Sequence, residues 1–289
     1  MEFWLFYPQM RSSLESIVER ARAAERSGFS GMALMDHLAP PMAERHSMYD
    51  PIVTAAWIAA HTERLRIAHL VLCDAMHHPA VLAKQAVALD HASGGRFELG
   101  IGSGSVPAEL DTFGIGDPGL GARLGRLRES LEVIRALWRG QSVDYDGEFH
   151  RLSAALQMPT PIDRIPIVIG GAGRRTLGFV AEHADWCNLP ITDLDRLDDL
   201  RSSIGSARVS VQVVVGLVTD PAQRQEVVEA VGARFGRHGD AVLVGDGPEI
   251  AARLAELAGR GVERTYVWFA DFARIETLEA FGAAVIERS

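Results

Sequence analysis

The sequence predicts an α/β protein folded as a single-domain (β/α)8 TIM barrel, and three observations lead to that prediction. Short apolar segments alternate with longer segments of helical periodicity along the whole chain of 289 residues. Alternation of this kind is typical of parallel strands connected by helices. Eight such units fit the length of roughly 250 residues at which parallel sheets close into barrels. An open Rossmann-like sheet is the alternative, but the GxGxxG expected after its first strand is missing.

The first four units are apolar strands, each with a helical segment after it. In the first unit, residues 3–7 form the strand and residues 12–27 have helical spacing, with Ser12 or Ser13 as the cap and Gly28 as the end. The next strands are predicted at residues 31–35, 65–72 and 97–102, with helices at about 50–62, 79–93 and 124–138.

The second half repeats the scheme after an insertion. Residues 140–165 carry Pro159, Pro161 and a turn at residues 145–148, so we expect an inserted hairpin and loop after the fourth helix. The remaining strands are predicted at residues 167–169, 185–189, 209–218 and 265–269, with helices after Gly173 and at about 221–235, 248–258 and 275–288.

Composition excludes several classes of protein. Hydrophobic residues make up 47% of the chain, which is too many for a disordered protein, and the net charge of −9 argues against a nucleic-acid binder. The chain has a single lysine, Lys84, so we do not expect a mechanism that uses a Schiff-base lysine. Cys73 and Cys187 lack any disulfide or CxxC pattern. With no signal peptide or membrane-spanning run recognised, we expect a cytoplasmic protein.

Function in such a barrel belongs to the loops that follow the carboxyl ends of the strands. The second predicted strand is followed by Asp36 and His37, which are candidates for catalysis, although a lone Asp-His pair is also ordinary loop polarity. His37 and Asp74 with His77 or His78 could form a zinc site. Because adjacent residues of an extended segment point in opposite directions, we expect no metal.

Two glycine-rich loops are candidates for binding a cofactor. Glycines after the fourth strand let a flat ring or a phosphate approach the backbone, and Glu109 beyond them is either a general acid or a helix-start carboxylate. The loop after the fifth strand leads into a helix and carries two arginines, which predicts a phosphate cradle. The residues concerned are Gly102, Ser103, Gly104 and Ser105 in the first loop and Gly170, Gly171, Ala172, Gly173, Arg174, Arg175 and Thr176 in the second.

Several stretches resemble the luciferase-like monooxygenase family of F420- and FMN-dependent oxidoreductases. They are residues 78–85 and 89–102, the segment 166–171 with 184–186 after its helix, and residues 244–251. The resemblance covers most of the chain. It implies a (β/α)8 barrel that binds reduced FMN or the deazaflavin F420 across the strand ends.

The same resemblance assigns roles to individual residues. It matches Asp36-His37 to a pair in which the histidine lies by the reactive ring carbon and helps catalysis. It matches residues 69–73 to a bulge with a non-prolyl cis peptide, which makes Leu70, Val71, Leu72 and Cys73 cofactor-binding candidates. Sugar-phosphate dehydrogenases of the F420 branch carry a catalytic glutamate where this chain has Ser105, which argues against a sugar-phosphate substrate.

The favoured hypothesis is an F420-dependent oxidoreductase that transfers a hydride between the deazaflavin and a small organic substrate, with His37 exchanging the proton. The alternatives are an FMN-dependent monooxygenase supplied by a separate reductase, a metal-dependent barrel hydrolase, and a non-catalytic flavin-binding protein. We also expect a homodimer, because the helix at residues 51–62 has more apolar residues than one core-facing stripe needs. They include Ile52, Ala55, Ala56, Trp57 and Ala59.

Overall fold

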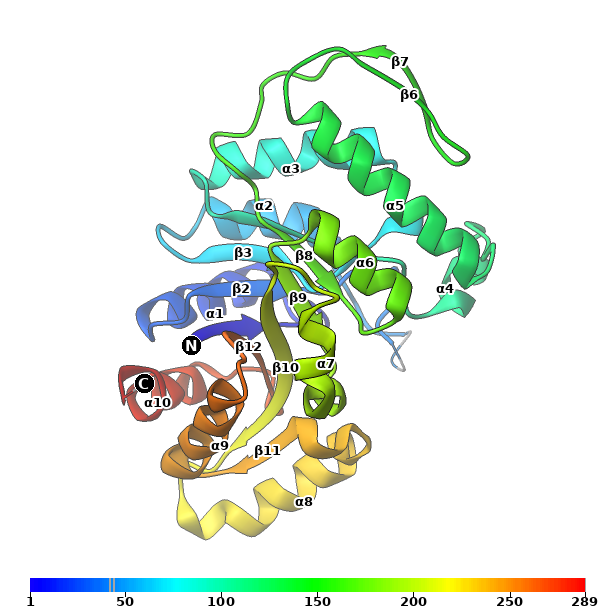
Figure 1. Ribbon diagram of the computed structural model, residues 1–289. Helices are drawn as coiled ribbons and strands as arrows, with labels where there is room; N and C mark the ends of the chain where they lie inside the picture. The colour runs from blue at the N-terminus through cyan, green and yellow to red at the C-terminus, as the bar shows by residue number, and fades with distance from the viewer. Residues whose placement is uncertain (42, 44, 289) are drawn as a thin grey trace.

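The eight predicted barrel positions are present and the barrel is closed, as shown by the computed structural model, which describes residues 1–41, 43 and 45–288 (Figure 1). The (β/α)8 fold is therefore confirmed. The strands follow one another around the ring in the order β1 (Glu2–Phe6), β2 (Gly31–Leu34), β3 (Arg66–His69) continued by β4 (Leu72–Cys73), β5 (Phe97–Gly102), β8 (Ile167–Gly170), β9 (Trp186–Leu189), β10 (Arg208–Leu217) and β12 (Arg264–Phe269).

Strand β10 closes the ring. It pairs in parallel with β9 through residues 208–211 and with β12 through residues 210–215. Its last residues, 214–217, pair with β11 (Val242–Gly245). The sequence did not predict β11, because this strand has only four residues and only half of them are buried. The strand β10 therefore extends beyond the barrel wall and holds one further strand at its carboxyl end.

Helices cover the outside of the barrel (Figure 1). The predicted cap Ser13 accepts a hydrogen bond from the amide of Ser16, and Gly28 follows the first helix with a φ of 84°. The α-helices are α1 (Leu14–Arg26), α2 (Pro51–Ala59), α3 (Pro79–Ser93), α4 (Pro107–Thr112), α5 (Leu120–Leu137), α6 (Arg174–His183), α7 (Leu197–Arg201), α8 (Arg224–Phe235), α9 (Gly247–Gly259) and α10 (Ile275–Ala284).

Short 3-10 turns complete the connections. They are η1 (Asp74–Met76), η2 (Ile191–Arg196), η3 (Pro221–Gln223), η4 (Gly236–Ala241) and η5 (Ile286–Arg288). The turns η3 and η5 lie at the ends of helices predicted at residues 221–235 and 275–288. The sequence did not predict the bounds of α4 and α7 or the turns η1, η2 and η4, because segments of three to six residues are too short to show helical periodicity. None of the helices in the described ranges has the length and apolar content needed to cross a bilayer.

The segment between α5 and β8 forms a two-stranded antiparallel hairpin, β6 (Val143–Asp146) and β7 (Arg151–Ala155), outside the barrel (Figure 1). Its turn is held by the buried carboxylate of Glu129 on α5, which accepts hydrogen bonds of 2.9–3.0 Å from the amides of Glu148, Phe149 and His150.

Strand three differs from the single strand predicted at residues 65–72. The chain leaves the ladder after His69 and returns at Leu72, and the peptide bond between Leu70 and Val71 is cis. The bulge packs against glycines of β5: a Cβ at Gly100 would lie 1.7 Å from the carbonyl oxygen of His69. The glycines of the fourth strand are therefore required for this bulge to approach so closely.

A buried ion cluster fills the barrel at the amino ends of the strands. The guanidinium of Arg264, which is 1% exposed, donates to Glu98 at 2.6 and 3.1 Å and to Glu2 at 2.8 Å. It lies 4.1 Å from the ring centroid of Trp4 and 3.7 Å from that of Trp186. In barrels of this kind the amino-terminal end contributes to stability and the carboxyl-terminal end to function.

Replacing Glu98 with Gln should therefore destabilise the fold. The variant leaves Arg264 buried with one carboxylate fewer, and breaking a buried ion pair from one side typically costs about 3–5 kcal/mol. Urea unfolding measures the change in the free energy of unfolding. The matched control is Glu256→Gln, which removes an exposed pair with Arg253 and should cost less than about 1 kcal/mol. Equal losses in both variants would contradict a stabilising role for the cluster.

Candidate functional site

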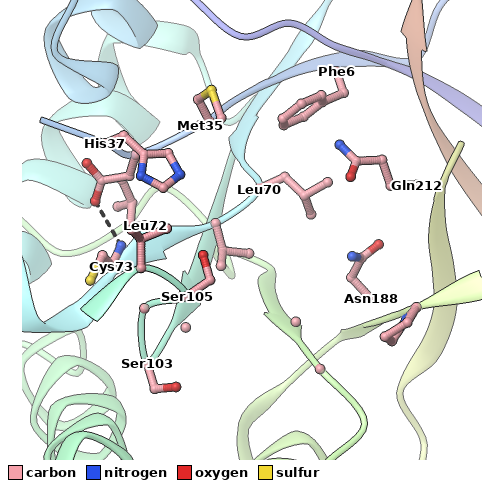
Figure 2. A pocket seen from close by; sticks show the side chains of 18 of the residues that line it. Phe6, Met35, His37, Leu70, Leu72, Cys73, Ser103, Ser105, Asn188 and Gln212 are labelled. Carbon is pink, nitrogen blue, oxygen red and sulfur yellow. Dashed lines mark hydrogen bonds between the residues drawn. The ribbon is translucent and has the colours of Figure 1, made fainter. Parts of the chain in front are cut away.

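A cavity of about 670 Å³ opens at the carboxyl ends of the strands, where the fold predicts function (Figure 2). Most of the candidate residues from the sequence line it, and they come from loops far apart in the chain. The predicted residues that line the cavity are Asp36, His37, Leu70, Val71, Leu72, Cys73, Gly102, Ser103, Gly104, Ser105, Gly170 and Gly171.

His37 is held in the cavity by Glu109. The imidazole Nδ1 lies 2.8 Å from Oε2 of Glu109, and the other carboxylate oxygen accepts hydrogen bonds from the amides of Leu38 at 2.7 Å and Ala39 at 3.2 Å. An ionised carboxylate can only accept, so Nδ1 carries the hydrogen of this bond. No described residue bonds to Nε2, which is therefore the ring nitrogen available to a ligand.

Glu109 was a minor candidate from the sequence, and the structure gives it a central place. It stands in the first turn of the short helix α4, as a helix-start carboxylate does, but its side chain reaches across to the loop after β2. Its side chain is 8% exposed. Spacing along the chain could not show this contact, because Glu109 and His37 are 72 residues apart.

Asp36 connects the second strand to the bulge of the third. One of its oxygens accepts hydrogen bonds of 2.8 Å from the amide of Cys73 and from Nε2 of His77. Burial alone would raise the pKa of Asp36, but these hydrogen bonds and the charge of His77 outweigh burial and leave the pKa below its usual value. The carboxylate therefore stays ionised and fixes the backbone on which His37 and Cys73 stand.

The residues of the zinc alternative do not share a site. The side chain of Asp74 faces Arg126, whose Nε lies 3.3 Å away, while His77 bonds to Asp36. His78 caps α3 through its Nδ1, and His37 bonds to Glu109. Among the residues that the structure describes, no group of three histidine, cysteine or acidic side chains is arranged to hold a metal ion.

The predicted phosphate cradle lies at the edge of the cavity. Gly170 and Gly171 line it, whereas Ala172, Gly173, Arg174, Arg175 and Thr176 lie beyond the lining. The helix α6 begins at Arg174, and its N-cap residue, Gly173, supplies no side-chain hydrogen bond to the first turn. The first amides of α6 and the exposed side chains of Arg174 and Arg175 are thus available to an anion outside the cavity.

The residues on the wall of the cavity that faces His37 were not predicted from the sequence. In the ring of strands, β2 and β9 occupy opposite positions, so the loops after β9 and β10 face the loop after β2. Figure 2 shows Asn188 and Gln212 across the cavity from His37. Gln212 could have been noticed as an amide between the valines of β10. Arg237 and His238, which also line this wall, follow no pattern in the sequence.

Comparisons with known proteins agree with the family resemblance. A family model described as luciferase-like monooxygenase matches residues 1–236. An uncharacterized protein of Mycobacterium tuberculosis is 32% identical over 223 residues, covering 70% of this chain and 78% of that protein. The F420-dependent glucose-6-phosphate dehydrogenase of Mycobacterium avium is 33% identical over 174 residues, which are 58% of this chain and 51% of that enzyme. The match therefore spans about half of the dehydrogenase.

A solved structure shares the fold over nearly the whole chain. The F420-dependent secondary alcohol dehydrogenase in complex with an F420–acetone adduct superposes with a TM-score of 0.84, at 16% sequence identity. The superposition covers 99% of this chain and 98% of that one.

The buried Asp74 next to this site should make stability depend on pH. Burial raises its pKa to about 6, against opposing effects of Ser130 and Arg126. Between about pH 4 and pH 6 the folded protein binds a proton that the unfolded chain does not, so this group's contribution to stability falls as the pH rises. This rise of the Asp74 pKa to about 6 in the folded protein corresponds to about 3 kcal/mol.

The variant Asp74→Asn should lose this dependence. Its free energy of unfolding, relative to that of the unsubstituted protein, should rise by about 3 kcal/mol between pH 4 and pH 7. Urea unfolding across this range is the measurement, with the exposed Asp198→Asn on α7 as the control. A constant difference between Asp74→Asn and the unsubstituted protein would show that Asp74 keeps an ordinary pKa.

Proposed function

Because the chain belongs to the luciferase-like monooxygenase family of oxidoreductases, we propose that it is an F420-dependent oxidoreductase acting on a small organic substrate. The observation that carries the proposal is His37, held by Glu109 with its Nε2 available in the cavity. The relation to an F420-dependent dehydrogenase supports the deazaflavin over FMN.

The residues present fit a flat cofactor with an anionic tail. Gly102, Gly104, Gly170 and Gly171 line the cavity with bare backbone, and the bulge at residues 70–73 forms the wall between them and His37. A Cβ at Gly102 would lie 2.9 Å from Cγ2 of Val71, and a Cβ at Gly104 would lie 2.7 Å from Sγ of Cys73, so neither position has room for a side chain. We expect the ring to lie against this backbone and the phosphate to lie at the amides of α6 near Arg174 and Arg175.

A bound deazaflavin would supply or accept the hydride, and the protein would handle the proton. A histidine suits proton exchange near neutral pH because its ordinary pKa is close to 6.5. Glu109 fixes the hydrogen of His37 on Nδ1, so that Nε2 gives or takes the proton of the substrate. Asp36 is a positioning residue in this scheme. A separate reductase or dehydrogenase of the cytoplasm would return the cofactor to its starting redox state.

The cofactor can be tested by titration. We expect F420 to bind more tightly than FMN, as measured by fluorescence. The variant Arg174→Ala should weaken F420 binding by about 1.5–3 kcal/mol through loss of a charged hydrogen bond, while the rate at saturation holds. Arg253→Ala, an exposed change on α9, is the control. Equal or tighter binding of FMN would favour the FMN-dependent monooxygenase instead.

His37→Ala should separate turnover from binding. The loss of a general acid or base typically lowers the rate by about 10²–10⁴-fold, whereas cofactor affinity should change little because the phosphate binds elsewhere. Glu109→Gln should lower the rate less, because the imidazole remains. It should still lower it, because the Gln side chain has one accepting oxygen in place of the two that accept from Nδ1 of His37 and from the amides of Leu38 and Ala39. Normal turnover in His37→Ala, measured with reduced cofactor and any accepted substrate, would remove His37 from the mechanism. Tight F420 binding without turnover of any tested substrate would favour the non-catalytic alternative.

We also propose a homodimer through α2 and α3. Of the apolar residues named for this helix, Ala55 and Ala59 belong to the core-facing stripe and are buried, at 0% and 4% exposure. Trp57, which the sequence also named, points outward at 42% exposure, together with Val53 at 66% and Val81 on α3 at 55%. Light scattering at micromolar concentration should report a dimer that Trp57→Glu converts to a monomer. A monomer before any substitution would contradict the proposal.

A further inference from the structure

A second cavity, of about 350 Å³, lies at the amino end of the barrel and shares none of its described lining residues with the cavity of His37. It is formed by the end of α5 and by residues 160–165, which lead into β8. Helices of such a barrel run antiparallel to its strands, so the end of α5 and the start of β8 lie at the same end. Its volume falls within the roughly 300–1,000 Å³ of small-molecule sites.

Three arginines line this second cavity. Arg135 stands in the last turn of α5, Arg139 lies just beyond that helix, and Arg164 comes from the loop before β8. Among the described residues of the lining, one, Asp163, is acidic. The chain as a whole has a net charge of −9, so this is a local excess of positive charge on an acidic protein. A recess lined by one sign of charge concentrates ligands of the opposite sign.

The charge of Arg135 is poorly compensated. Its Nη2 donates to the carbonyl oxygen of His183, the last residue of α6, but its Nε is buried and has no hydrogen-bond partner among the described residues. Burial lowers the pKa of Arg135; Asp185 opposes this effect, and the charge of Arg164 adds to it. A buried donor of a charged group is unfavourable without an acceptor, so an anion in the cavity would stabilise Arg135.

The neighbouring carboxylate of Asp185 is already used by other groups. Its Oδ1 pairs with Nη2 of Arg164 at 2.6 Å, and its Oδ2 accepts a hydrogen bond from the amide of Ile167 at 2.9 Å. The side chain of Arg139 is exposed and forms no hydrogen bond or ion pair within the part of the chain that the structure describes. Arg139 and the remaining donors of Arg135 and Arg164 are therefore open to a ligand.

The loop that carries Arg164 is fixed to α3. Nε2 of His91 donates to the carbonyl oxygen of Thr160 at 2.9 Å, and the amide of Ile162 donates to Oδ2 of Asp90 at 2.7 Å. The wall of the cavity is thus held in place by neighbouring structure. A site formed in advance loses little free energy to ordering when a ligand binds.

The second cavity also offers a surface for a flat ring. Trp138 lines it, and the indole N–H of this residue already donates to the carbonyl oxygen of Ala83 at 3.1 Å, so the part of the ring that lines the cavity is apolar. Aromatic side chains of this kind stack with nucleobases. The exposed carboxylate of Asp163, which has no partner among the described residues, can accept hydrogen bonds from the hydroxyl groups of a sugar.

We propose that the second cavity is a binding site for a nucleoside diphosphate. Its phosphate oxygens accept hydrogen bonds from Arg135, Arg139 and Arg164, and its base packs on Trp138. A diphosphate suits the site better than a carboxylate, because three guanidinium groups supply more donors than two oxygens can take. This site differs from the one expected for the cofactor phosphate: α6 begins there, at Arg174, and its other end contacts Arg135 (Figure 1).

The test compares ADP, adenosine and pyrophosphate by calorimetric titration of the protein. We expect ADP to bind at least about tenfold more tightly than adenosine, since a charge-assisted hydrogen bond typically contributes at least that factor. ADP should also bind more tightly than pyrophosphate, which lacks the ring. Arg139→Gln should weaken ADP binding about tenfold and leave thermal unfolding unchanged, because this side chain has no described partner to lose. Arg135→Gln should weaken it as well, and the exposed control Arg253→Gln should not.

A variant of the cofactor cradle separates the two anion sites. Arg174→Ala should leave ADP binding unchanged, so a loss of ADP affinity in this variant would place ADP at the first turn of α6 and overturn the proposal. Equal binding of ADP and adenosine, or an unchanged ADP affinity in Arg139→Gln, would also overturn it. Pyrophosphate that binds as tightly as ADP would remove the nucleoside from the assignment and leave a site for inorganic phosphates in its place.

Discussion

The ten residues of β10 are the constraint on which the rest of the site depends. This strand pairs with β9 near its start, with β12 along its middle and with β11 at its end, so it both closes the barrel and extends past it. Closure places the loop of β2 and the loops of β9 and β10 on opposite sides of one cavity. His37 and the wall of Gln212, Arg237 and Trp268 face each other only because this strand joins the two ends of the sheet.

The two ends of the barrel are stabilised by different means. At the amino end, Arg264 and Glu98 form an ion pair that is buried, and the rings of Trp4 and Trp186 pack against the guanidinium. At the carboxyl end, Asp36 and Glu109 use their oxygens to hold loop backbone and histidines in place. Such bonds leave the cavity side of each loop free for ligands. A rigid site of this kind needs little reorganisation when charge develops in a reaction.

The barrel and the half of the site around Asp36-His37 and the glycine loops could be predicted from the sequence. Buried strands appear in the sequence as apolar segments, so the strand at residues 209–218 and the other barrel strands could be located. The Asp36-His37 pair and the glycine loops follow directly from strand ends. Glu109 could not be placed, since a contact over 72 residues leaves no local pattern. The strand β11 and the turn η4 were missed because they are short and half exposed, and the wall that carries Arg237 was missed with them.

The cofactor and the role of His37 can be tested together by a crystal structure of the protein with F420 bound. We expect the deazaflavin ring to lie against the bulge at residues 70–73, with Nε2 of His37 at its reactive edge. We expect the phosphate at the first amides of α6, and the space between the ring and Trp268 left open for a substrate. A ring bound outside this cavity, or a bound ring with His37 turned away and its contact with Glu109 broken, would show that His37 does not exchange the proton in this site.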